Sequence, residues 1–193
     1  MGEVEGQVRS EKLDAEREAR RRAALAQIRQ YPDPALRLRA GEVEQFDDSL
    51  RELVDRMGRL MKEANGVGLA ANQMGVLRRV FVYQTADEEP LVALVNPRIV
   101  AVSEELASDE EGCLSIGAAS VVVEVERPTT VTIEAFSPTG EPIRIEAEGL
   151  AARVVQHELD HLDGVLIIDR TSPEQRRSAL GRLRPQPQLG VLA

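Results

Sequence analysis

Apolar residues recur at two different spacings along this chain, and the change of spacing separates helical from strand-forming parts. In residues 47–64 they recur every three or four positions, which predicts an amphipathic helix capped by Asp47 or Asp48. In residues 79–146 short apolar runs alternate with polar turns, which predicts strands joined by hairpins. Helical spacing then returns in residues 150–162.

These patterns predict an α+β fold. The predicted helices are residues 10–29, 48–64, 150–162 and 173–183. The predicted strands are residues 79–84, 91–95, 121–125, 131–136 and 143–146, with a further strand-like run at 165–168. Because strands precede the third helix without regular strand-helix alternation, we expect short antiparallel sheets packed around one central helix.

Length and composition suit one domain with flanking segments. A chain of 193 residues with 42% apolar residues can bury one core. We expect residues 1–27 to form a charged extension, helical or disordered. A catalytic domain should occupy residues 28–170, and residues 171–193 should form a helix and a disordered tail rich in Pro and Gln.

The charge and the apolar pattern exclude several classes of protein. The net charge of −9 argues against general nucleic-acid binding, which needs clustered Lys and Arg, and we expect no sequence-specific nucleic-acid binding. No apolar run reaches the roughly 20 residues that span a bilayer, and the charged first residues lack the apolar centre of a signal peptide. We therefore expect a cytoplasmic protein that binds no membrane. A single cysteine rules out an internal disulfide bond.

The two histidines of the chain, His157 and His161, flank Glu158 in one helical segment. Residues four apart project from the same face of a helix, so both imidazoles can bind one metal ion. Glu158 is turned aside from that face and is a candidate general base for a water molecule at the metal. The alternative is a surface helix that carries these residues by chance.

A catalytic metal site of this kind needs a third protein ligand and an open fourth position. No third histidine exists, so the candidates are a downstream carboxylate, Asp169 or Glu174, or the thiol of Cys113. From the residues alone these alternatives stay open.

Three segments together resemble the signature motifs of the peptide deformylase family, in the same order along the chain. They are Gly66-Val67-Gly68-Leu69-Ala70-Ala71-Asn72-Gln73, Glu111-Gly112-Cys113-Leu114-Ser115 and Gln156-His157-Glu158-Leu159-Asp160-His161. The resemblance extends from about residue 28 to residue 170. It implies hydrolysis of the N-formyl group from the N-terminal formyl-methionine of nascent proteins, with release of formate.

The resemblance also implies roles for individual residues. Cys113, His157 and His161 would bind the metal, and Glu158 would act on its water. The side chain of Gln73 and the backbone N–H of Leu114 would stabilise the oxyanion. The candidate substrate-binding residues are Val67, Gly68, Glu111, Leu150 and Val154, of which Leu150 and Val154 share a helix face with His157.

The cofactor and the partners follow from the same resemblance. One divalent ion per chain is expected, with Fe²⁺ as the physiological ion and Zn²⁺, Ni²⁺ or Co²⁺ as alternatives. The substrates would be N-formyl-methionyl peptides. The basic strip of the C-terminal helix is a candidate contact with ribosomal RNA, and it consists of Arg170, Arg176, Arg177, Arg182 and Arg184.

The chain departs from the family pattern after the cysteine motif. Residues 117–120 read Gly-Ala-Ala-Ser, where many members have a proline and then an arginine that helps to hold the substrate. Two other readings remain: a zinc peptidase with a downstream carboxylate ligand, and a structural metal module without enzymatic activity. Loss of metal in Cys113→Ala would separate the deformylase from the peptidase.

Overall fold

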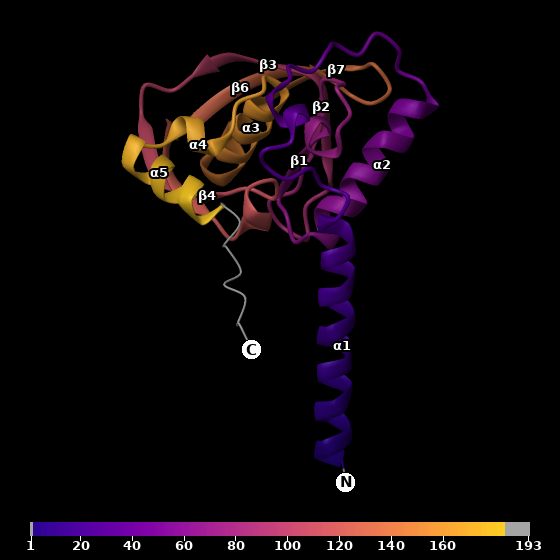
Figure 1. Ribbon diagram of the computed structural model, residues 1–193. Helices are drawn as coiled ribbons and strands as arrows, with labels where there is room; N and C mark the ends of the chain where they lie inside the picture. Colours follow the sequence, from indigo (N-terminus) through magenta and orange to yellow (C-terminus); the bar gives the residue numbers. More distant parts are fainter. Residues whose placement is uncertain (1, 184–193) are drawn as a thin grey trace.

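The computed structural model describes residues 2–183, and its strands form a five-stranded and a two-stranded sheet, both antiparallel (Figure 1). The helices are α1 (Gly2–Leu25), α2 (Asp48–Glu63), α3 (Gly149–Leu162), α4 (Ile167–Arg170) and α5 (Pro173–Arg182), with short 3-10 turns at Pro34–Arg37, Ala71–Met74 and Gly117–Ala119. The strands are β1 (Gly68–Ala70), β2 (Val80–Tyr83), β3 (Val92–Val102), β4 (Leu106–Gly112), β5 (Val122–Pro128), β6 (Thr130–Phe136) and β7 (Pro142–Glu148). The larger sheet has the order β1-β2-β3-β6-β7, and β4 pairs with β5. The α+β prediction is confirmed.

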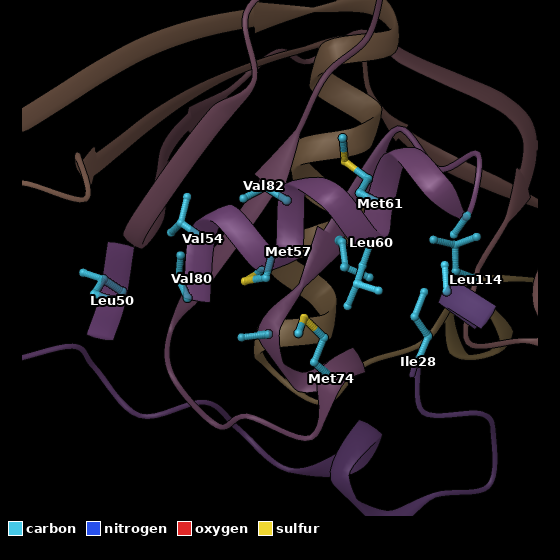
Figure 2. Packing of buried hydrophobic residues seen from close by; sticks show 14 of the residues in the cluster. Ile28, Leu50, Val54, Met57, Leu60, Met61, Met74, Val80, Val82 and Leu114 are labelled. Carbon is cyan, nitrogen blue, oxygen red and sulfur yellow. The ribbon is translucent and has the colours of Figure 1, made fainter. Parts of the chain in front are cut away.

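Helix α2 forms where the apolar spacing predicts it. Its N-cap is Asp47, whose carboxylate accepts a hydrogen bond from the backbone N–H of Leu50 at 3.1 Å. The apolar face of the helix packs against β1 and β2, as Figure 2 shows for Met57, Val80 and Val82. This first core supports β1, which leads into the Gln73 turn.

Helix α3 carries the two histidines and packs against both sheets. Ala152, Val155 and Leu162 on one side of it are fully buried and belong to a second core with Phe81 and Ile133 of the larger sheet. The prediction of a central helix among short antiparallel sheets is thereby confirmed, and the histidine-bearing segment is held rigidly.

The prediction of a strand at residues 165–168 is wrong. Those residues enter α4, whose N3 residue Asp169 accepts a hydrogen bond from the backbone N–H of Leu166 at 2.9 Å. Ile167 and Ile168 are both buried in a third core, together with Cys113. A short apolar run that fills a core from one helical turn has the same sequence pattern as a buried strand, so periodicity could not separate the two.

Three strand segments were not predicted. Strand β1 forms in the Gly-rich segment of the first motif, where its residues pair with β2. Strand β3 continues beyond Val95 through irregular pairing with β6. Strand β4 is exposed except at Glu111, and residues 108–111 in it are polar. It forms because all seven of its residues pair with β5. Apolar and polar residues do not alternate in β4. Its own sequence therefore does not indicate a strand, and its pairing with β5 determines its conformation.

Helix α1 extends away from the rest of the molecule (Figure 1). Side chains of residues 14–20 are exposed, whereas Ala24 at its end and Ile28 just beyond it are buried in the first core. None of the described helices is long and apolar enough to cross a bilayer. The predicted tail after residue 183 lies outside the described residues.

Candidate active site

The sulfur of Cys113 lies beside the two histidines of α3. The Sγ atom is 3.2 Å from Nε2 of His161, and one ligand atom from each of Cys113, His157 and His161 lies within 4.8 Å of the others. Cys113 directly follows β4, so the paired strands β4 and β5 bring the thiol to the histidine helix. The three residues expected to bind a metal are therefore adjacent in space, although Cys113 lies 44 and 48 positions before the two histidines in sequence.

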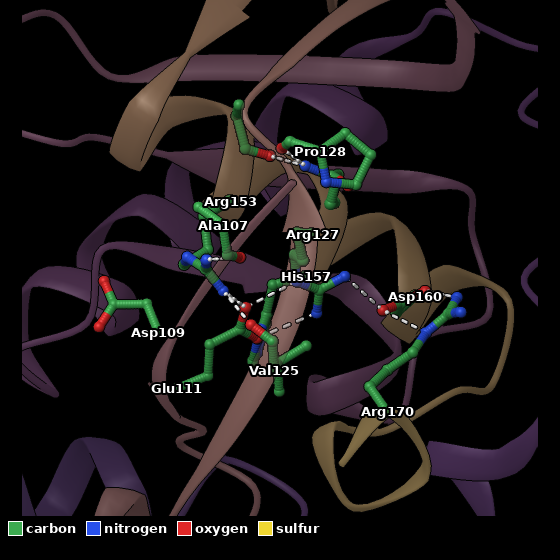
Figure 3. A network of polar contacts seen from close by, with 12 residues as sticks. Ala107, Asp109, Glu111, Val125, Arg127, Pro128, Arg153, His157, Asp160 and Arg170 are labelled. Atoms are coloured by element: carbon green, nitrogen blue, oxygen red, sulfur yellow. Dashed lines mark hydrogen bonds and ion pairs between the residues drawn. The ribbon is translucent and has the colours of Figure 1, made fainter. Parts of the chain in front are cut away.

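Glu111 orients the first histidine. Its carboxylate Oε2 is 3.0 Å from Nδ1 of His157, which leaves Nε2 of that ring free to face the thiol. The same carboxylate accepts hydrogen bonds from Arg127 Nε at 2.6 Å and from Arg153 Nη1 at 2.8 Å (Figure 3). Glu111 is 5% exposed, so these bonds replace its contact with water.

Arg127 extends this network along α3 to Asp160, about one turn beyond His157. Besides Glu111 it donates to Asp160 at 2.9 Å, and Asp160 also accepts from Arg170 at 3.1 Å (Figure 3). Burial opposes the ionisation of Glu111, but the hydrogen bond from His157 and the charge of Arg127 outweigh it and hold the pKa of Glu111 well below its ordinary value. The acceptor for His157 is thus a carboxylate at neutral pH.

The donor set fits a divalent cation. Burial lowers the pKa of His161 well below its ordinary value, so this ring is neutral, as a metal ligand must be. For His157 burial acts in the same direction, but Cys113 and Glu111 outweigh it and raise the pKa. Cys113 and Glu111 therefore stabilise a positive charge beside them. A metal ion bound through sulfur and neutral imidazoles would supply that charge.

Glu158 is buried beside the candidate metal ligands. Its side chain is 3% exposed, and Oε2 has no hydrogen-bond partner among residues 2–183. Burial raises the pKa of Glu158 to about 7. A Cβ atom on Gly68 would lie 2.8 Å from Cδ of Glu158, so the carboxylate occupies space that only glycine leaves open. A buried carboxylate of this kind is suited to accept a proton.

Gln73 is held by its carbonyl oxygen, which leaves its amide nitrogen directed at the site. Oε1 accepts from the backbone N–H of Ala70 at 2.8 Å. Nε2 donates to Ser115 Oγ at 3.2 Å and lies 3.8 Å from Cys113 Sγ. The backbone N–H of Leu114 makes no hydrogen bond within the described part of the chain. Gln73 Nε2 and the N–H of Leu114, the residue directly after Cys113, are thus two hydrogen-bond donors near the thiol.

A cavity of about 240 Å³ opens beside these residues. Its walls include the apolar candidates Val67, Leu150 and Val154, of which Val67 is 44% and Leu150 54% exposed. Of the candidate substrate-binding residues, Gly68 and Glu111 also line it, but the Glu111 carboxylate is bonded to His157, Arg127 and Arg153. Apolar side chains are therefore available to an apolar group that enters the cavity.

The carboxylates considered as alternative ligands lie elsewhere. Asp169 is bonded to Arg37, to the backbone N–H of Leu166 and, at 2.8 Å, to Arg176. Glu174 is exposed in the first turn of α5. Since the metal-binding group found among the described residues contains neither, a peptidase site with a downstream carboxylate ligand is not present there.

The sequence reading missed the residues that support the ligands. Arg127, Asp160 and Ser115 are all buried and polar. Arg127 bonds to Glu111 and Ser115 bonds to Gln73, whereas Asp160 acts through its bond to Arg127. The available signal was weak. Arg127 is an arginine within a strand-like pattern, and Asp160 lies inside the histidine motif, but neither feature names the partner.

Comparisons with known proteins agree on one family. The family profile described as polypeptide deformylase matches residues 25–177. The peptide deformylase 1 of Corynebacterium glutamicum is 45% identical over 163 residues, which cover 83% of this chain and 95% of that protein. The peptide deformylase of Caldicellulosiruptor bescii is 48% identical over 80% of this chain and 95% of its own length.

Solved structures give the same result. The crystal structure of the Thermotoga maritima peptide deformylase has 45% identity and a TM-score of 0.72, covering 76% of this chain and 97% of that one. The Legionella pneumophila peptide deformylase has 39% identity and a TM-score of 0.75, covering 82% and 98%.

Proposed function

Since this chain belongs to the peptide deformylase family, it is a metal-dependent hydrolase that removes the formyl group from N-terminal formyl-methionine, and we propose how its residues divide that task. Cys113, His157 and His161 would hold one divalent ion, as their mutual distances allow. When bound, the ion supplies Lewis acidity to the formyl carbonyl and to the attacking water.

Glu158 is the proposed proton carrier. Its unpartnered oxygen accepts a proton from the attacking water and then gives it to the amine nitrogen of methionine as the amide bond breaks. The raised pKa of Glu158, about 7, supports both steps, because such a carboxyl group can take up and release a proton near neutral pH.

Gln73 Nε2 and the backbone N–H of Leu114 are the proposed donors to the tetrahedral oxyanion. The anchored carbonyl of Gln73 fixes the direction of its Nε2, so little reorganisation is needed when charge develops. Losing one such donor typically costs about 3 to 4 kcal/mol of transition-state stabilisation.

The cavity is the proposed methionine pocket. Val67, Leu150 and Val154 would contact the methionine side chain, while Gly68 and the backbone of Glu111 would face the peptide chain. The carboxylate of Glu111 would act through His157, because all its bonds are to protein groups.

Fe²⁺ is the proposed physiological ion. Sulfur and imidazole ligands also accept Zn²⁺, Ni²⁺ and Co²⁺, so metal availability decides the occupant. Metal analysis of protein purified without oxygen tests this proposal, which fails if iron is absent and the zinc form is fully active.

Domain bounds and cellular location are also proposed. Residues 28–170 would form the catalytic domain, between the N-terminal extension and the C-terminal segment. The protein would act in the cytoplasm. Of the basic strip, Arg184 lies outside the described residues, and Arg170 and Arg176 pair with Asp160 and Asp169. Contact with ribosomal RNA would therefore involve the exposed Arg177 and Arg182. If a protein with both Arg177→Glu and Arg182→Glu still co-sediments with ribosomes, this proposed contact is refuted.

Formate release tests the proposed function. Metal-loaded protein is expected to release formate from a formyl-Met-Ala-Ser peptide without cleaving its backbone. Glu158→Gln should retain the metal and lose nearly all turnover, since a structural metal site would not depend on a base. Backbone cleavage, or full activity of Glu158→Gln, would contradict the proposal.

A further inference from the structure

The loop that follows the cysteine motif has an unusual backbone. Gly117, Ala118 and Ala119 have φ angles of 57°, 52° and 65°. Two successive alanines in the left-handed region are strained, because their Cβ atoms crowd the backbone, and they need support from their surroundings. Ala119 lines the active-site cavity, so the shape of this loop affects the site directly.

The support comes from the end of α1 and the segment that follows it. The side-chain oxygen of Gln30 accepts from the backbone N–H of Ala118 at 3.2 Å, and its Nε2 donates to the backbone carbonyl of Leu114 at 2.8 Å. Arg21 Nη2 donates to the carbonyl of Ala118 at 3.4 Å. The half-buried amide of Gln30 therefore joins the loop to the residue after Cys113, using both of its polar ends.

We propose that Gln30 is a positioning residue for deformylation, which fixes the Cys113–Leu114 segment so that the N–H of Leu114 faces the reacting carbonyl. This inference rests on the proposed function. The carbonyl of Leu114 is held by Gln30, and the next carbonyl, that of Ser115, accepts from the backbone N–H of Tyr31 at 2.8 Å.

The side chain of Leu114 completes the restraint. It is 7% exposed and packs in the first core, where a Cβ on Gly66 would lie 2.7 Å from its Cδ1. With its carbonyl and its side chain both fixed, Leu114 cannot rotate without breaking one of these contacts. The carbonyl of Cys113, in the same peptide unit as the N–H of Leu114, accepts from the backbone N–H groups of Ile116 at 3.0 Å and Ala119 at 2.9 Å. Loss of Gln30 therefore removes the side-chain part of the restraint, on Leu114 directly and on Ala119 through the neighbouring Ala118.

Two variants test the role of Gln30. Gln30→Met keeps the length of the side chain and removes both hydrogen bonds, whereas Gln30→Glu keeps the acceptor for Ala118 and loses the donor to Leu114. We expect kcat for a formyl-Met peptide to fall about 10-fold or more in both, with KM within about threefold and with metal content unchanged, because oxyanion donors act in the transition state.

Gln27→Met is the matched control. Gln27 is exposed in the same segment and contacts Ala23 and Arg56, away from the loop. Its kcat should equal that of the unaltered protein. If the unaltered protein releases no formate, the proposed function fails. If it is active and both Gln30 variants keep its kcat, or change only KM, the positioning role alone is refuted. If Gln30→Met does not fold, Gln30→Glu decides in the same way.

Discussion

Replacing Gly68 with alanine is expected to displace the Glu158 carboxylate while leaving the metal ligands in place. The added Cβ would lie 2.8 Å from Cδ and 2.9 Å from Cγ of Glu158, whereas carbon atoms in contact normally lie about 3.5 to 4.0 Å apart. Gly68 has no positive φ angle, so the substitution causes no backbone strain of its own. The carboxyl group must therefore move by about 1 Å.

A displacement of about 1 Å in a catalytic group can lower a rate about 100-fold, which is about 2.7 kcal/mol at the transition state. The assay is formate release by protein of measured metal content, with a thermal melt to show that the variant is folded. Gly181→Ala in α5 is the control, because a Cβ there meets nothing within 4 Å. A folded, metal-loaded Gly68→Ala protein with kcat within threefold of the unaltered protein would refute the claimed position of Glu158.

Three further predictions concern stability. Arg127→Met removes the shared partner of the buried carboxylates Glu111 and Asp160, so the free energy of unfolding in urea should fall by about 3 kcal/mol, and an unchanged value would contradict the network. Burial opposes the ionisation of Asp169, but the hydrogen bond from Arg37 holds its pKa below the ordinary value. Asp169→Asn should therefore lower the free energy of unfolding by about 1 kcal/mol at neutral pH. The difference between the two proteins should vanish as pH falls through the lowered pKa, because the ionised carboxylate stabilises the fold and is lost there. Removal of the metal by a chelator should lower Tm, since an ion at 100 times its Kd stabilises the folded state by about 2.7 kcal/mol, and an unchanged Tm would argue against a bound ion.

The part of the site that lies on one helix was predictable from sequence. The four-residue spacing of His157 and His161 places both rings on one face wherever that helix packs, and α3 confirms it. The thiol of Cys113 could be added only through resemblance to a family, because nothing local to it indicates a partner near residue 157. The structure supplies that proximity through the pairing of β4 with β5.

The supporting contacts could not be predicted. Arg127 bonds to Glu111 across 16 positions and to Asp160 across 33, and such pairs leave no periodic signal in a single sequence. Gln30 bonds to Leu114 across 84 positions and gives no signal either. Local patterns predicted the longer helices and most strands but not α4, whereas long-range pairing decided strand β4 and the polar network around α3.

X-ray absorption at the metal edge tests the central claim most directly. The account predicts one sulfur at about 2.3 Å and two imidazole nitrogens at about 2.0 to 2.1 Å in the zinc form, with a remaining position filled by a light atom from solvent. Cys113→Ser should remove the sulfur signal. A spectrum without sulfur in the unaltered protein, or one with four ligands that all come from side chains, would contradict the account.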